Sequence, residues 1–158
     1  MKILGKVPGA PIPRKVVVER GEEKFVFTCQ AVLNYDEFDK LVPVPKPQTF
    51  RKPGGVATTE SPNDPAFVKR LEEYAMKKTN YLVLKSLEAT DGLEWESVNM
   101  VDPTTWDNYK DELNNAGFTD GEIGFIINQV ANVHTVDEAR MKEAIERFIP
   151  TASQEAEA

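Results

Sequence analysis

The sequence predicts an α+β fold that is predominantly helical, with an N-terminal β-hairpin packed on a long central helix and three shorter helices after it. Three observations predict this fold. Two runs of β-branched and aromatic residues flank a glycine turn near the N-terminus. A long helical pattern then runs from residue 65 to about residue 89. Downstream, Asp-Pro and Thr-x-x-Glu signatures mark the starts of further helices.

The chain has 158 residues, a length typical of one domain. Glycine and proline are so frequent in residues 1–14 that we expect an irregular N-terminal segment. Residues 15–149 are predicted to form a single globular domain. Residues 150–158 are small and acidic, so we expect a disordered tail.

The hairpin is predicted from residues 15–19 and 24–28, which surround the turn Arg-Gly-Glu-Glu. Because side chains alternate along a strand, Phe25 and Phe27 share one face. A bare hairpin is marginally stable in water. We therefore expect it to pack on the long helix.

A short helix and a long loop come next. Asn34 is a suitable N-cap for an amphipathic helix that ends at Pro43. Repeated prolines and glycines then predict a long loop over residues 43–64. Loops of this length inside a domain are usually functional or mobile.

Asp64-Pro65 is a cap followed by proline at the first helical position, which predicts the start of the long helix. Residues 81–84 are apolar all round, so that part is expected to be covered on several sides. The helix is predicted to end at Asp91-Gly92. Its predicted apolar stripe consists of Phe67, Leu71, Tyr74, Ala75, Leu82 and Leu87.

The last third of the chain contains three predicted helices. Residues 93–101 are interpreted as an extended segment. Asp102-Pro103 opens a helix that carries Trp106, Tyr109 and Leu113 on one side and closes at Gly117. Capping boxes at residues 119–122 and 135–138 predict helices over residues 120–133 and 136–148.

Composition limits the classes of function. The formal net charge is −7, which argues against a nucleic-acid partner because phosphate contacts need an excess of Lys and Arg. No apolar run is long enough to span a bilayer, and the N-terminus lacks the core of a signal peptide. One cysteine cannot form an internal disulfide, and this fits a reduced, cytosolic compartment.

Side chains suited to catalysis are scarce. His134 is the only candidate imidazole base, and its place before a helix cap favours an interaction with the end of the preceding helix. Cys29 lies in an apolar run and is interpreted as a small buried hydrophobe. Zinc and calcium sites both lack the required ligand pattern. The sequence therefore predicts a protein that is not an enzyme and holds no metal or cofactor.

Aromatic residues are the remaining candidates for function. We expect most of them to lie in the core and one or two to be exposed anchors for a partner protein. The sequence does not distinguish the anchors from the core residues. Phe50 lies in a small basic loop patch with Lys46, Arg51 and Lys52, for which a solubilised loop is the simpler interpretation. The candidate partner-binding residues are Phe50, Trp95, Trp106, Tyr109 and Phe118.

The order of these features resembles the tail assembly chaperones of long-tailed bacteriophages, from about residue 16 to residue 149. The resemblance rests on capping and packing patterns and on no catalytic fingerprint. After the hairpin, the motifs that carry it are Asn-Tyr-Asp-Glu-Phe-Asp-Lys-Leu (34–41), Lys-Pro-Gly-Gly (52–55), Asn-Asp-Pro (63–65), Phe-Val-Lys-Arg-Leu-Glu-Glu-Tyr (67–74), Asn-Tyr-Leu-Val-Leu-Lys-Ser-Leu (80–87), a Trp-containing segment, Gly-Phe-Thr-Asp-Gly-Glu-Ile (117–123) and Asp-Glu-Ala-Arg-Met-Lys-Glu-Ala (137–144).

This resemblance implies a non-enzymatic protein in the cytoplasm of the infected bacterial host. Such chaperones coat the tape measure protein and help to recruit tail tube subunits. In many phages a ribosomal frameshift near the end of the chaperone gene yields a longer form. The family supplies no functional residue that can be carried over, and a homo-oligomer stays open. Two alternatives remain: a structural virion component, such as a minor tail or connector protein, and an enzyme or enzyme regulator acting through His134 and Cys29.

Overall fold

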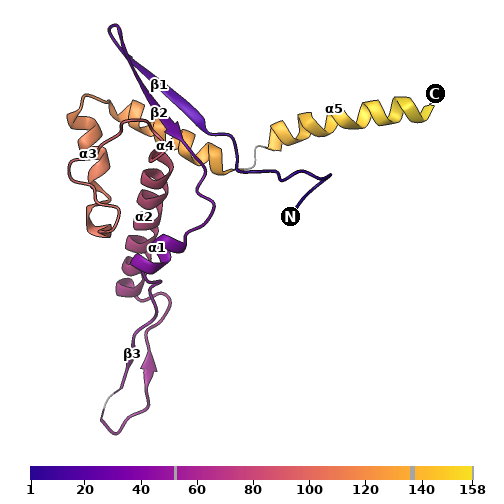
Figure 1. Cartoon of the computed structure of the whole chain (residues 1–158). Helices are drawn as coiled ribbons and strands as arrows, with labels where there is room; N and C mark the ends of the chain where they lie inside the picture. The colour runs from indigo at the N-terminus through magenta and orange to yellow at the C-terminus, as the bar shows by residue number, and fades with distance from the viewer. Residues whose placement is uncertain (52, 136–137, 158) are drawn as a thin grey trace.

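A computed structural model of the chain, described for residues 1–51, 53–135 and 138–157, has the α+β fold that the sequence predicts (Figure 1). An N-terminal hairpin precedes the long helix α2, and further helices follow it. In chain order the elements are β1 (Arg14–Arg20), β2 (Glu23–Cys29), α1 (Asp36–Leu41), β3 (Thr49–Phe50), β4 (Thr58–Thr59), α2 (Pro65–Leu87), the 3-10 turn η1 (Pro103–Thr105), α3 (Asn108–Asn115), α4 (Asp120–His134) and α5 (Glu138–Glu157).

Strands β1 and β2 pair antiparallel in a register that runs from Arg14 opposite Cys29 to Arg20 opposite Glu23. The two-residue turn between them needs a positive φ, which Gly21 supplies at +63°. Phe25 and Phe27 share one face, as predicted, but only Phe27 is buried. Phe25 is 43% exposed, whereas Val18, directly opposite it on β1, is buried, so the cover of the hairpin is incomplete on the β2 side.

The hairpin packs against both α2 and α4, whereas the sequence predicted contact with α2 alone. The segment after β2 is fixed to the same two helices. Gln30 N donates to Ser86 O of α2 at 3.1 Å. Val32 N donates to His134 Nε2 at 2.7 Å, and His134 Nδ1 lies 2.7 Å from Val130 O. His134 therefore contacts the end of its own helix, as expected, and also holds a distant segment.

Helix α2 begins as predicted, with Asp64 Oδ1 accepting a hydrogen bond from Ala66 N at 3.0 Å. It ends at Leu87, before Asp91-Gly92. Leu71 and Ala75 are exposed although the predicted stripe placed them inside, because the N-terminal half of α2 extends away from the hairpin (Figure 1). The C-terminal half enters the core as expected: its buried residues are Tyr81, Val83, Leu84, Ser86 and Leu87.

Residues 93–101 form no strand: the stretch is irregular, with a bend at residues 96–97 and a turn at residues 100–101, so the extended segment predicted there is not found. Local hydrogen bonds fold this stretch back onto the next turn: Asn99 N donates to Thr105 Oγ1 at 2.9 Å, and Trp106 Nε1 donates to Asn99 O at 3.1 Å. The helix predicted after Asp102-Pro103 opens as the 3-10 turn η1 and becomes α3 only at Asn108.

Helix α4 begins with the predicted capping box, in which Glu122 N donates to Thr119 Oγ1 at 3.2 Å. The second predicted box includes residues 136–137, which lie outside the described residues. Helix α5 continues to Glu157, so the prediction of a disordered tail is wrong for residues 151–157. Alanine, glutamine and glutamate in this stretch have high helix propensity and prolong the helix. Helix α5 projects from the body (Figure 1).

The predicted loop over residues 43–64 contains the short strands β3 and β4 and forms an arm that extends past the start of α2 (Figure 1). One buried carboxylate fixes its base. Glu60 Oε2 lies 2.5 Å from Arg70 Nη2 and accepts from Gln48 N at 3.0 Å. These bonds join both ends of the arm to α2.

Aromatic rings fill the core where α1, α2 and η1 meet. Trp106 is fully buried, with ring centroids 5.4 Å from Tyr81 and 6.0 Å from Phe38. Phe38 and Tyr81 are themselves 5.4 Å apart. Of the described helices, none is both long and apolar enough to cross a membrane.

We predict that Trp106→Ala lowers the free energy of unfolding by about 3–5 kcal/mol, because it leaves a cavity and removes the hydrogen bond to Asn99. Urea unfolding followed by circular dichroism measures this change. Met76→Ala on the exposed side of α2 is the control and is expected to change stability by about 0.5 kcal/mol or less. A loss below about 1 kcal/mol for Trp106→Ala would contradict this account of the core.

Candidate functional site

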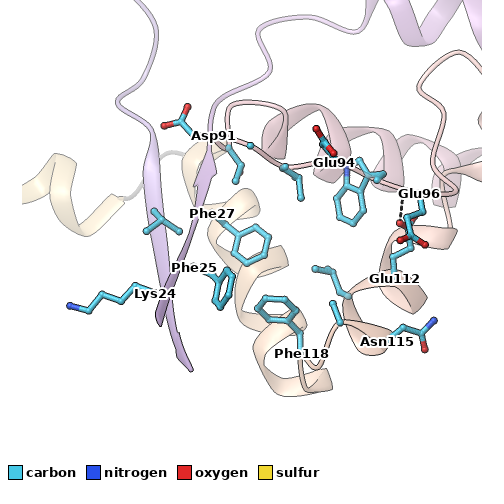
Figure 2. A pocket seen from close by; sticks show the side chains of 16 residues that line it. Lys24, Phe25, Phe27, Asp91, Glu94, Glu96, Glu112, Asn115 and Phe118 are labelled. Atoms are coloured by element: carbon cyan, nitrogen blue, oxygen red, sulfur yellow. Dashed lines mark hydrogen bonds between the residues drawn. The ribbon is translucent and has the colours of Figure 1, made fainter. Parts of the chain in front are cut away.

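A cleft of about 640 Å³ opens between strand β2, the turn that follows α2, and the C-terminal end of α3 (Figure 2). We call it the aromatic cleft. Aromatic and leucine side chains from three separate segments contribute to its lining: Phe25, Phe27, Leu93, Trp95, Leu113 and Phe118.

Local structure places these side chains. The alternation of β2 directs the rings of Phe25 and Phe27 to the same side, toward the cleft (Figure 2). After α3 the chain reverses at Gly117, whose φ of +101° is suited to glycine. Phe118 N then donates to Leu113 O at 3.0 Å, and the Phe118 ring meets Phe27 edge-on at 5.4 Å. The reversal at Gly117 thus brings Phe118 against the strand.

One side of the cleft is acidic. Asp91, Glu94 and Glu96 are exposed along the turn after α2 (Figure 2). Lys24 also lines the cleft, but Figure 2 shows its side chain pointing away. An apolar surface beside three exposed carboxylates favours a ligand that is apolar and carries positive charge.

A fourth carboxylate, Glu112, holds the acidic side in place. It accepts hydrogen bonds from Glu96 N at 2.6 Å, Ser97 N at 3.2 Å and Ser97 Oγ at 2.9 Å. Burial alone would raise the pKa of Glu112, but the bonds from Glu96 and Ser97 hold it below its ordinary value. Glu112 therefore stays ionised and ties the turn to α3.

Arg20, at the end of β1, fixes the opposite end of the cleft. Its Nη2 lies 2.6 Å from Glu122 Oε1 and 3.3 Å from Gly117 O, and its guanidinium carbon lies 5.4 Å from the centre of the Phe118 ring. The hydrogen bond from Arg20, assisted by one from Thr119 N, lowers the pKa of Glu122 to about 2. The hairpin end, the turn at Gly117 and the start of α4 are thus held together beside Phe118.

The structure separates the five candidate aromatics. Trp95 and Phe118 are half-buried and both line the cleft. Trp106 and Tyr109 are 0% and 1% exposed, so their interpretation as surface anchors is wrong. Their spacing on one helical face with Leu113 is the pattern of a core. Phe50 is 55% exposed, lies in β3 on the arm and is not among the residues that line the cleft.

Sequence reasoning missed most of the cleft. The alternation of β2 placed Phe25 and Phe27 on one face, but no local signal indicated that this face continues past the core. Leu93 had no signal of its own, and Leu113 was identified only as part of the apolar side of a helix. Contacts between residues far apart in the chain bring these groups together.

The two candidate catalytic side chains serve structural contacts. Cys29 is fully buried, and burial raises the pKa of its thiol to about 11, which disfavours the reactive thiolate. Both ring nitrogens of His134 are engaged by main-chain groups. Within residues 1–51, 53–135 and 138–157, no group of three or more His, Cys, Asp or Glu side chains is arranged to hold a metal ion.

Comparisons with protein families, curated proteins and solved structures find no match for this chain. The function proposed below is therefore supported by the geometry of the aromatic cleft and by the order of features in the sequence.

We predict that Glu122→Gln destabilises the fold near pH 7 and has a smaller effect in acid. The pKa of Glu122 lies below its ordinary value of 4.5, so the stability from its ionised form is present above pH 4.5 and is lost as pH falls toward 2. Urea unfolding of both proteins across pH 2–7 measures this difference. Glu19→Gln removes a charge from an exposed pair and is the control. A deficit for Glu122→Gln that is the same at pH 3 and pH 7 would contradict this assignment.

Proposed function

We propose that the protein is a non-enzymatic assembly chaperone that binds an apolar segment of a partner chain in the aromatic cleft. The observation that carries this proposal is a cleft in which half-buried Trp95 and Phe118 and exposed Phe25 lie beside a row of carboxylates. Tryptophan and other large apolar side chains in partly desolvated pockets are typical anchors of protein interfaces.

The partner that we propose is the tape measure protein of a long-tailed bacteriophage, with tail tube subunits recruited later. The order of motifs along the chain supports this identity. The excess of acids, with a net charge of −7, keeps a complex soluble while apolar partner segments are covered. We place this activity in the cytoplasm of the infected host, where the tail is assembled.

A structural virion component is the second candidate, because two parts of the molecule project with exposed apolar side chains. Helix α5 carries Met141, Ile145 and Phe148, and the arm carries Phe50 and Val56. Exposed apolar surfaces of this kind can form permanent contacts between the subunits of a virion. Mass spectrometry of purified virions separates the candidates, since a connector is present at fixed copy number and a chaperone is scarce or missing.

We predict that co-expression with fragments of the tape measure protein raises their soluble fraction and that the two chains co-elute on gel filtration. Trp95→Ala and Phe118→Ala are each expected to weaken the complex by about tenfold or more, the effect of removing an interface anchor. Phe50→Ala is the matched control, because it removes an exposed aromatic ring outside the cleft.

Two results would contradict this proposal. One is the absence of any gain in solubility and of any complex with fragments that together cover the tape measure protein. The other is a complex that survives both cleft substitutions but is lost with Phe50→Ala, which would place binding on the arm. Circular dichroism of each variant establishes that the fold is retained.

A further inference from the structure

The outer edge of strand β2 is part of the aromatic cleft. In an antiparallel pair, successive residues direct their N–H and C=O groups alternately toward the partner strand and away from it. Thr28 faces away from β1, since its N–H donates to Thr90 Oγ1 at 2.9 Å and its carbonyl accepts from the same hydroxyl at 3.4 Å. Val26 and Lys24, two and four positions earlier, therefore face the same way.

These two residues bring main-chain groups to the cleft. Both line it, although the Lys24 side chain points away from it (Figure 2). No residue in the described ranges hydrogen-bonds to their outward N–H and C=O groups. Thr90 thus completes the edge at one end of the cleft, and the next two pairing positions along β2 are open.

We propose that the aromatic cleft binds its partner segment as an extended strand that adds to the free edge of β2. The main chain of this strand pairs with Val26 and Lys24 and stops at Thr90. Its apolar side chains, at alternate positions, pack on Phe25 and Phe118. Lysine or arginine side chains of the segment face the carboxylates of Asp91 and Glu94. The identity of the natural partner rests on the proposed function, whereas the mode of binding does not.

Backbone hydrogen bonding favours a strand over a helix as the occupant. A helix satisfies its own N–H and C=O groups, so a helix in the cleft would cover the edge of β2 and leave the groups of Lys24 and Val26 without partners. Buried polar groups without partners are costly. An added strand pairs them and extends a two-stranded sheet, which is marginal alone, to three strands.

Synthetic peptides test the mode of binding without any change to the protein. The probe is a capped heptapeptide in which lysine alternates with valine around a central phenylalanine. N-methylation of a residue whose N–H faces β2 is expected to weaken binding about tenfold, as for one lost backbone hydrogen bond. N-methylation of the adjacent residue is the control and is expected to leave binding unchanged. Isothermal titration calorimetry gives the affinities, and slower amide exchange at Lys24 and Val26 locates the peptide.

A pair of proline substitutions tests the edge from the side of the protein. Val26 and Val17 are cross-strand partners with exposed side chains, and their outward N–H groups lie on opposite edges of the hairpin. Proline is tolerated on strand edges where the N–H faces solvent. Val26→Pro is expected to weaken peptide binding about tenfold and Val17→Pro to leave it unchanged, with both variants folded by circular dichroism.

Several outcomes would overturn the proposal. One is a shuffled peptide of the same composition, without the alternation of apolar residues, that binds as tightly. Another is an equal loss of affinity from both N-methylated peptides. The remaining two are no measurable binding of any peptide and equal effects of the two proline substitutions. Self-association of the wild-type chain that Val26→Pro abolishes would show instead that a second copy covers the edge. If the heptapeptide binds β2 while tape measure fragments do not bind, the strand mode stands and the proposed chaperone function fails.

Discussion

The two-stranded hairpin β1–β2 depends on α2 and α4 for its stability, because two strands alone bury too little apolar surface. Its inner face meets this need through Val16, Val18, Phe27 and Cys29, which are buried. Phe25, opposite the buried Val18, stays exposed on the β2 side. The aromatic cleft is thus the continuation of the core on the side of β2 that the rest of the molecule leaves uncovered.

The walls of the cleft are held by polar contacts that reach across the chain. Arg20 ties the end of β1 to Gly117 and Glu122, and Glu112 ties α3 to the turn after α2. Each contact joins segments that are separate in the sequence. An apolar cleft in water tends to close, and these contacts fix the backbone on both sides so that it stays open.

Local sequence signals predicted the fold well. Asp64-Pro65 and the capping box at Thr119 each gave the start of a helix, and alternation identified both strands of the hairpin. The errors occurred where local propensity was overridden or misjudged. Residues 93–101 turn back because Asn99 bonds to Thr105 and Trp106, and α5 continues through helix-forming residues taken for a tail.

The candidate site was less accessible to sequence reasoning. Trp95 and Phe118 were identified as candidates, but they could not be told from the buried Trp106 and Tyr109, since burial depends on distant segments. The free edge of β2 had no signal at all. Which edge of the hairpin lies in the cleft depends on the strand that Thr90 contacts, here β2 through Thr28. That contact is made only in the folded chain.

Helix α2 sets the distance between the arm and the aromatic cleft. The arm is anchored at its first turns through Glu60 and Arg70, and the cleft begins just after its last turn, at Thr90. A helix of 23 residues rises about 34 Å, a span that an extended peptide covers with roughly ten residues. A peptide shorter than this is too short to reach from the cleft to the arm, whereas a longer extended chain has the length to contact both at once.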